Sequence, residues 1–236
     1  TGSGKTTTLN CLGMYIPWHR RLLTVEDTAE LQVYHDHWLR METRRERPDG
    51  TPEVDMNDCL KSSLRMRPDR IIVGEVRGPE AATLLTAMNT GHDGSFGSLH
   101  ANTAQETVTR MINPPMNVPP IMLTGLDLII IQARLHVNGK TARKITEVAE
   151  IAGMEGSKPR LNTIWKYNAS TDQIEETGIP SNLREVICRA AGVTPDVFEK
   201  HVNQRQQIIE DLIARDITDI QSVTTVIQNF YAQSHH

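Results

Sequence analysis

The fold is decided near the start of the chain, by the stretch Gly2-Ser3-Gly4-Lys5-Thr6-Thr7. Two glycines let successive backbone N–H groups turn toward one point, where they can bind phosphate oxygens. The lysine can supply positive charge to the β- and γ-phosphates, and the Thr6 hydroxyl can bind Mg²⁺. A helix predicted over residues 6–16 and ended by Pro17 places its positive N-terminus behind this loop.

The alternative for this stretch is a glycine-rich turn with a surface lysine. The predicted helix directly after the loop argues against that alternative, because phosphate loops lead into a helix N-terminus. The candidate nucleotide-binding residues are Thr1, Gly2, Ser3, Gly4, Lys5, Thr6 and Thr7. The complete pattern contains another glycine, which would precede Thr1. We therefore expect that the chain starts inside the motif and lacks the strand before it.

Composition limits the classes of protein that fit. The 236 residues carry a formal net charge of −4, so no overall field attracts nucleic acid or membrane, and no nucleic-acid partner is expected. Three cysteines at positions 11, 59 and 188 have no ligand spacing and cannot all pair, which favours a reducing compartment. No apolar run approaches the length of a membrane-spanning helix, so insertion into a membrane is not expected.

Short apolar runs alternate with predicted helices through the first half of the chain. The runs, interpreted as buried strands, are residues 22–26, 71–75 and 95–100. Between and after them, Asp55, Pro79 and Thr103 mark predicted helix starts. Residues 28–54 are interpreted as irregular. The alternation predicts an α/β fold with a mostly parallel sheet.

The second half of the chain has a different pattern. Asn138-Gly139 separates two strand-like runs, residues 128–137 and 141–152, and predicts a β-hairpin. Another strand is predicted over residues 161–167, and only helices follow Ser181, one of them starting at Thr194-Pro195. The predicted organisation is a core over residues 1–180 with a β-hairpin extension, and a C-terminal helical subdomain over residues 181–236. That subdomain could pack within the chain or touch neighbouring subunits.

Acidic residues end two of the predicted buried strands. Glu75 ends the second, and Glu26-Asp27 end the first. The carboxyl ends of parallel strands meet at one edge of a sheet, so these acids are expected beside the phosphate loop. A nucleotide hydrolase needs one carboxylate for Mg²⁺ and another to orient the attacking water. The alternative is that these acids simply begin loops.

Four motifs in this order resemble the secretion ATPase superfamily. The phosphate loop looks like its Walker A motif and residues 25–28 look like its Asp-box. Residues 67–78 look like its Walker B motif, and residues 91–102 look like its His-box. This superfamily powers type II and type IV secretion, type IV pili and the archaeal flagellum (archaellum). The resemblance covers essentially the whole chain and implies a RecA-like P-loop NTPase core. The resemblance also implies an N-terminal domain that clamps the nucleotide, which we expect to be missing from this sequence.

The resemblance implies roles for the acids and histidines. Glu26 would be the general base or position the attacking water, and Glu75 with Thr6 would support Mg²⁺. His92 and His100 would couple the γ-phosphate to neighbouring elements, although a lone histidine is more often structural. A zinc site at these histidines is not expected, because no cysteine or acid completes a tetrahedral set.

Arginines are the remaining candidates. Arg44 looks like the family's loop arginine, and Arg67 and Arg77 lie near the second acidic strand. An arginine that reaches a neighbour's γ-phosphate stabilises charge in the transition state. Most arginines are solvated surface residues, which is the alternative for all three.

Within the superfamily, the resemblance is closest to the archaellum motor ATPase. It rests on residues 138–151, 161–166 and 176–181. It implies Mg²⁺-dependent ATP hydrolysis by a homo-hexameric ring in the cytoplasm, at the inner face of the membrane, with a polytopic platform protein and accessory motor subunits as partners. The alternatives are a type IV pilus or type II secretion ATPase, and an assembly subunit that binds nucleotide without hydrolysing it.

Overall fold

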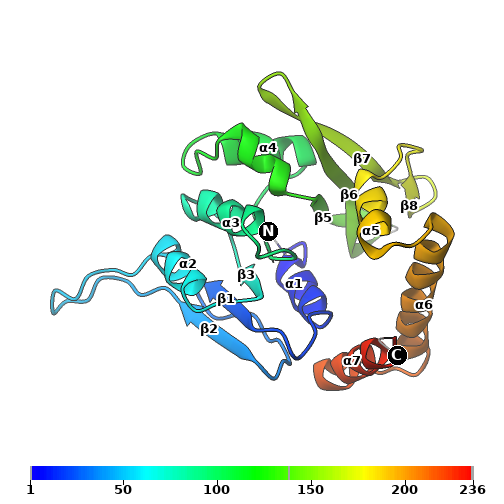
Figure 1. Ribbon diagram of the computed structural model, residues 1–236, viewed down its shortest axis with the longest axis horizontal. Coiled ribbons are helices and arrows are strands. Elements are labelled where there is room, and N and C mark those ends of the chain that lie inside the picture. The colour runs from blue at the N-terminus through cyan, green and yellow to red at the C-terminus, as the bar shows by residue number, and fades with distance from the viewer. Residues whose placement is uncertain (1, 138, 235–236) are drawn as a thin grey trace.

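The computed structural model describes residues 2–137 and 139–234 (Figure 1). Predictions that concern Thr1 and Asn138 lie outside the described residues. Two four-stranded sheets organise the described chain, one of them parallel and the other antiparallel. The α/β class predicted from the sequence is confirmed, with the parallel strands gathered in a sheet of their own.

The parallel sheet has the strand order β2-β1-β3-β4. Its strands are β1 (Leu22–Glu26), β2 (Trp38–Glu42), β3 (Arg70–Val73) and β4 (Phe96–Gly97). Every residue of β1 is buried, as expected for a strand that is covered on both faces. All three pairings are parallel, so the carboxyl ends of these strands meet at one edge.

Two sequence interpretations of this sheet need correction. Residues 28–54 were expected to be irregular, but they contain β2, which pairs with β1 over five residues. This edge strand is mostly exposed and carries Arg40 and Glu42, so it lacks the apolar run of a buried strand. The strand predicted over residues 95–100 is only two residues long.

Helices cover both faces of the parallel sheet. They are α1 (Lys5–Gly13), α2 (Met56–Leu64), α3 (Glu80–Asn89) and α4 (Ala104–Ile112), followed by the 3₁₀ helix η1 (Pro120–Gly125). Leu9 and Ile16 pack with Ile72 on one face, whereas Leu60, Leu85 and Ile71 belong to the main core on the other. The predicted helix starts are confirmed: Asp55 and Asp58 form a capping box, and the Thr103 side chain accepts the N–H of Glu106.

The antiparallel sheet runs in sequence order. Its strands are β5 (Leu128–Val137), β6 (Lys140–Glu155), β7 (Lys158–Asn168) and β8 (Gln173–Glu176). Val137 pairs with Lys140, which confirms the predicted hairpin. Ile129, Ile131 and Ala149 are buried in the main core together with residues of α3, α4 and η1. The second sheet is therefore fixed to the first through shared helices.

Three helices follow the antiparallel sheet: α5 (Asn182–Ala191), α6 (Pro195–Ala214) and α7 (Ile220–Ser234). The α6 start is confirmed at Pro195, although Thr194 makes no side-chain cap hydrogen bond. The buried Glu150 carboxylate accepts hydrogen bonds from Ser181 Oγ and the Asn182 N–H, which fixes the start of α5.

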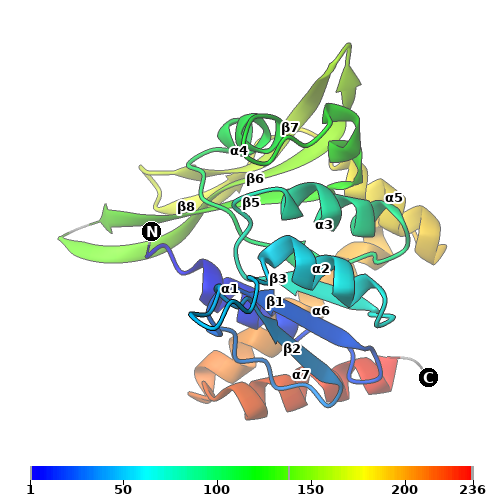
Figure 2. The same ribbon diagram turned by 90° about the vertical axis from the view of Figure 1, so that its left-hand side faces the viewer.

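The last helix returns to the beginning of the chain. In Figures 1 and 2, α7 lies beside α1. The buried Gln228 side chain donates to the carbonyls of Met14 and Ile16 at 2.8 and 2.9 Å, and accepts the N–H of Trp18 at 3.3 Å. Gln228 thus satisfies two carbonyl groups of the turn that follows α1.

Among the residues described here, none of the helices combines the length and the apolar character that crossing a membrane requires.

Candidate nucleotide-binding site

A cavity of about 960 Å³ lies between the N-terminal loop and the carboxyl edge of the parallel sheet. It is lined by most of the residues that the sequence predicts for the site. These are Gly2, Ser3, Gly4, Lys5, Thr6, Thr7, Glu26, Glu75, Arg77 and His100. Side chains from separate parts of the chain therefore converge where the phosphate-loop interpretation requires.

The loop backbone adopts the turns for which glycine is needed. Gly2 and Gly4 have φ angles of 72° and 95°, a region that other residues adopt at a cost. Gly4 is the N-cap of α1, and the helix begins at Lys5. The positive end of α1 and its unpaired N–H groups are therefore available to an anion at the cavity.

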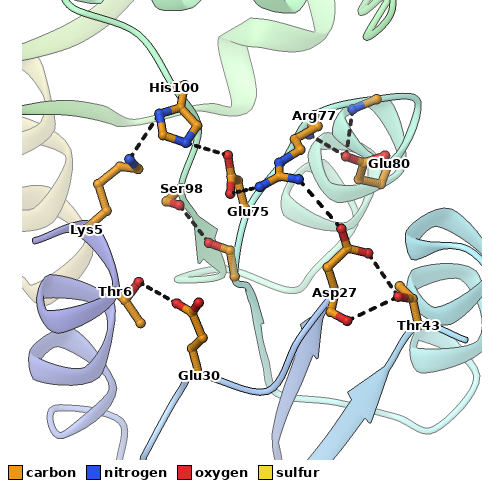
Figure 3. Close-up of polar contacts among 12 residues, drawn as sticks. Lys5, Thr6, Asp27, Glu30, Thr43, Glu75, Arg77, Glu80, Ser98 and His100 are labelled. Carbon is orange, nitrogen blue, oxygen red and sulfur yellow. Dashed lines mark hydrogen bonds and ion pairs between the residues drawn. The ribbon is translucent and has the colours of Figure 1, made fainter. Parts of the chain in front are cut away.

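A chain of polar side chains links the loop to the sheet edge (Figure 3). Lys5 Nζ lies 3.4 Å from His100 Nδ1, and His100 Nε2 lies 2.8 Å from Glu75 Oε1. The second carboxylate oxygen of Glu75 accepts a hydrogen bond from Arg77 Nη2 at 2.5 Å. Arg77 Nη1 in turn lies 3.8 Å from Asp27 Oδ2. The strand-end acids and Lys5 thus belong to one connected group.

Burial and charge shift the ionisation of this group. Burial by itself would raise the pKa of Glu75, but the hydrogen bond from Arg77 and the charges of His100, Arg77 and Lys5 outweigh it and lower that pKa. Burial, and then the charge of Lys5, lowers the pKa of His100. Nδ1 of His100 faces the Lys5 ammonium and Nε2 faces the Glu75 carboxylate, so the ring lies between a cation and an anion.

Arg77 is positioned by the start of α3. The buried Glu80 accepts the backbone N–H groups of Arg77 and Gly78 at 2.6 and 2.7 Å. This carboxylate in the first turn holds the chain where it leaves β3 and enters the helix. Ser98 Oγ also donates to the Gly74 carbonyl at 2.6 Å, which ties the end of β4 to the end of β3 (Figure 3).

Glu26 is held more rigidly than Glu75. Its Oε1 accepts the N–H groups of Glu30 and Leu31 at 2.9 and 2.8 Å, and its Oε2 lies 3.6 Å from Arg40 Nε. The side chain is only 3% exposed. A Cβ at Gly74 would lie 3.0 Å from Glu26 Cγ, so glycine is needed at position 74 for this close approach.

The Thr6 hydroxyl, expected to bind Mg²⁺, contacts an acid in this structure. Thr6 Oγ1 donates to Glu30 Oε2 at 3.3 Å, and Glu30 also lines the cavity (Figure 3). The sequence interpretation did not include Glu30, which follows the Asp-box acids by only three or four positions. An acidic oxygen beside the expected metal-binding hydroxyl adds to the cation-binding character of this side of the cavity.

The donor set fits a magnesium nucleotide. Glu26 Oε2 and Glu75 Oε1 are buried oxygens that accept no hydrogen bond from the described protein; the His100 contact with Glu75 has the distance of an ion pair but not hydrogen-bond alignment. Such oxygens can accept from a water or bind a hard cation. Lys5 and the loop N–H groups would hold the phosphates, and the carboxylate oxygens would hold Mg²⁺ or its waters, so the residues present fit both the nucleotide and the metal.

Three of the candidate site residues lie elsewhere, and one of them is Arg67, which is not among the residues that line the cavity. Arg44 pairs with Val54 in an isolated β-bridge, and its Nη2 donates to the Pro52 carbonyl at 3.0 Å. His92 Nδ1 lies 3.3 Å from the Ala87 carbonyl at the end of α3. Neither residue lines the cavity.

Two residues of the antiparallel sheet reach the cavity without having been predicted from the sequence. Gln132 Oε1 accepts from Thr8 Oγ1 at 2.8 Å, and Arg143 Nε donates to the Gly2 carbonyl at 3.0 Å. A Cβ at Gly4 would lie 3.1 Å from Gln132 Nε2 and 3.3 Å from Arg143 Cδ, so the second sheet lies directly against the loop. Over 120 positions separate these partners, and no local sequence signal links them.

A glycine loop leading into a helix, beside the carboxyl edge of a parallel sheet that carries acids, is the arrangement of a P-loop nucleotide-binding protein. Comparison with known proteins agrees with that class. A family model described as "Type II/IV secretion system protein" matches residues 1–227. The chain belongs to this family.

Individual relatives come from archaea and bacteria. The chain is 34% identical to protein MJ1287 of Methanocaldococcus jannaschii over 89% of its own length and 78% of that protein. It is 38% identical to the putative conjugal transfer protein Rv3659c of Mycobacterium tuberculosis, over 70% of this chain and 48% of that one.

Among solved structures, the chain is similar to the VirB11 ATPase of the Brucella suis type IV secretion system. The two are 32% identical with a TM-score of 0.53, and the match covers 64% of this chain and 46% of VirB11. The chain spans about half the length of several curated relatives that it matches.

Proposed function

We propose that the protein hydrolyses ATP to ADP and phosphate with Mg²⁺ at the cavity described above. The observation that supports this most is the convergence of Lys5, Thr6, Glu26 and Glu75 on one cavity. Lys5 and the loop N–H groups would bind the phosphates, and Thr6 and Glu75 would hold the metal. When bound, Mg²⁺ neutralises charge that develops on the transferred phosphate.

Glu26 would orient the attacking water. Its Oε1 is fixed by two backbone N–H groups, and its Oε2 keeps a free lone pair, so the carboxylate can accept a proton or a hydrogen bond in a fixed direction. His100 lies between Lys5 and Glu75 and would respond when a γ-phosphate pulls Lys5 toward itself. Arg77 donates to the other carboxylate oxygen of Glu75 and would keep that carboxylate in position.

At the level of the machine, we propose a homo-hexameric archaellum motor that converts hydrolysis into domain motion. It would act at the cytoplasmic face of the membrane, beneath a polytopic platform protein and with accessory motor subunits. The resemblance of residues 138–151, 161–166 and 176–181 supports this choice. In this proposal the catalytic core is residues 1–180, completed by an N-terminal domain, and Arg44 and His92 act in the assembled ring.

A second candidate is the ATPase of a secretion, conjugation or type IV pilus system. The likeness to VirB11 of a type IV secretion system and to a conjugal transfer protein favours it. Gene neighbourhood separates the two candidates. Genes for archaellum filament proteins beside this gene would support the first, and genes for prepilins or conjugation proteins would support the second.

The proposed activity is tested by ATP turnover in the full-length protein. We expect Lys5→Ala and Glu26→Gln to abolish phosphate release while circular dichroism and thermal melting stay close to wild type. Lys61→Ala, at an exposed lysine of α2, is the matched control and should keep full activity. Undiminished turnover in either site variant would contradict ATP hydrolysis at this cavity. Wild-type binding without turnover would favour a nucleotide-binding assembly subunit.

A further inference from the structure

Two arginines of the antiparallel sheet face each other beside the phosphate loop. Arg134 of β5 and Arg143 of β6 are direct cross-strand partners in the register of the hairpin. Directly opposite side chains point to the same face of a sheet, with Cβ atoms only about 5 Å apart. Like charges in this position destabilise a sheet unless an anion lies between or beside them.

Both arginines approach the same glycine of the loop. Arg143 Nε donates to the Gly2 carbonyl at 3.0 Å, and Arg143 lines the cavity. A Cβ on Gly2 would lie 3.5 Å from Arg134 Nη1, so this second guanidinium reaches the loop as well. The pair therefore lies against the phosphate loop, with Arg143 close to both Gly2 and Gly4.

No carboxylate of the described chain neutralises this pair. Within residues 2–137 and 139–234, Arg20, Arg40, Arg77, Arg110, Arg184 and Arg215 each form an ion pair with an acid. Neither Arg134 nor Arg143 forms one in the same part of the structure. Other exposed arginines also lack an acidic partner, but Arg134 and Arg143 face each other beside a loop built for anions, where two positive charges suit an anionic ligand.

The Arg143 contact also orients the loop. The Gly2 carbonyl points toward Arg143, and in a planar trans peptide the N–H of the next residue points the opposite way. The N–H of Ser3 is thereby turned away from Arg143. Because Nε makes the contact with the carbonyl, the two Nη groups of Arg143 remain to donate to an oxyanion.

We propose that Arg134 and Arg143 bind the phosphate chain of the nucleotide from within the same subunit. This inference rests on the proposed nucleotide site and adds a second binding surface, contributed by the antiparallel sheet, to the loop and Lys5. Arg143 contacts phosphate directly through its Nη groups, and Arg134 adds charge beside it. The ligand feature recognised is a polyphosphate, independent of the base.

Binding measurements on the full-length protein test the pair, with ATP, AMP and inorganic tripolyphosphate as probes. We expect Arg143→Gln to weaken ATP and tripolyphosphate binding by about tenfold or more, as for a lost charge-assisted hydrogen bond, and AMP binding by much less. Arg134→Gln leaves the Gly2 carbonyl contact in place and should weaken ATP and tripolyphosphate binding by about threefold. Arg160→Gln is the control, because exposed Arg160 likewise donates to one carbonyl, that of Ala152, but lies outside the cavity.

The outcomes separate this inference from the proposed function. ATP binding within about twofold of wild type in both Arg143→Gln and Arg134→Gln would overturn the arginine pair, while loss of binding in Lys5→Ala would leave the nucleotide site standing. A loss confined to Arg143→Gln would assign that residue to loop orientation alone and overturn the paired site. If Arg143→Gln does not fold, Arg134→Gln decides the question. Unchanged binding in Lys5→Ala would overturn the nucleotide site itself.

Discussion

The two sheets of this chain contribute to one cavity in different ways. The inner strands β1 and β3 of the parallel sheet are mostly buried, and the acids that line the cavity lie at the carboxyl edge, where Glu26 ends β1 and Glu75 follows β3. The antiparallel sheet buries one face against α3, α4 and η1 and presents Gln132 and Arg143 from its strands to the loop. The first sheet supplies strand-end acids, and the second supplies side chains that hold the loop.

This difference follows from how each sheet is covered. A parallel strand that is covered on both faces has no free side, so its functional groups are confined to the strand end. An antiparallel sheet with one free face can present alternate side chains along a strand. The cavity between the two sheets is thus lined by strand-end acids of the parallel sheet and by side chains from within strands of the antiparallel sheet.

The largest expected effect comes from the acid edge of the parallel sheet. Glu75→Gln removes the negative charge between His100 and Arg77 but keeps the side-chain volume. We expect ATP turnover to fall by about 100- to 1,000-fold with nucleotide binding largely kept, because the charge supports the metal during phosphoryl transfer. Steady-state phosphate release and nucleotide binding are the measurements.

Glu53→Gln is the control for this prediction, since Glu53 is an exposed acid of the loop before α2. It should turn over ATP at the wild-type rate. A Glu75→Gln protein as active as this control would mean that the carboxyl edge is not where the chemistry takes place.

The next effect concerns the link between the last helix and α1. Gln228→Ala removes three hydrogen bonds and leaves the Met14 and Ile16 carbonyls, just after α1, without this partner. We expect a loss of about 3 kcal/mol in the free energy of unfolding, measured by urea denaturation. Gln221→Ala, at an exposed position of the same helix, should change stability by less than about 0.5 kcal/mol. Equal stability of the two variants would show that α7 is not anchored through Gln228.

A smaller effect is expected where the two acid-bearing strands pack against each other. Gly74→Ala places a methyl group 3.0 Å from Glu26 Cγ, which must move. Overpacking of this kind costs about 2 kcal/mol, and the displaced carboxylate should also slow turnover. Gly13→Ala is matched to it: the new Cβ would meet Val33 at 3.3 Å, and helix propensity offsets part of the strain. If Gly74→Ala is as stable and active as Gly13→Ala, Glu26 does not depend on glycine at position 74.

The smallest effect is a pH dependence at His100. Burial and the charge of Lys5 lower its pKa below the ordinary 6.5, so the unfolded chain takes up a proton first as the pH falls. The contribution of the neutral ring to stability is complete above pH 6.5 and is lost as the pH falls through the folded-state pKa. His100→Gln should therefore lose less stability than wild type between about pH 7.5 and about pH 5.5 in urea denaturation. His19→Gln, at an exposed histidine, should keep the wild-type slope, and a His100→Gln slope as steep as wild type would contradict this account.

Much of the parallel half could be predicted from sequence because its signals are local. The apolar runs before Glu26 and Glu75, and the caps Asp55 and Thr103, act over a few residues each. Strand β2 was missed because an exposed edge strand carries charges and needs no apolar run. The position of the acids beside Lys5 followed from one topological rule about parallel strands.

The rest of the site depends on contacts distant in sequence. Arg143 and Gly2 are 141 positions apart, and Gln132 and Thr8 are 124 apart, so only the packed position of the antiparallel sheet brings them together. Conversely, Arg44 belongs to a β-bridge with Val54 that a motif-based assignment does not reveal. Its role, like that of His92, stays a prediction for the assembled protein.

The most direct test of the central claim, that both sheets act on one nucleotide, is a crystal structure of the full-length protein with Mg²⁺ and a non-hydrolysable ATP analogue. The account predicts phosphate oxygens within hydrogen-bond distance of Lys5 and of the loop N–H groups, Arg143 donating from the antiparallel sheet, and the metal beside Thr6 and Glu75. A nucleotide bound outside this cavity, or phosphates that contact the loop while Arg143 points to solvent, would contradict it.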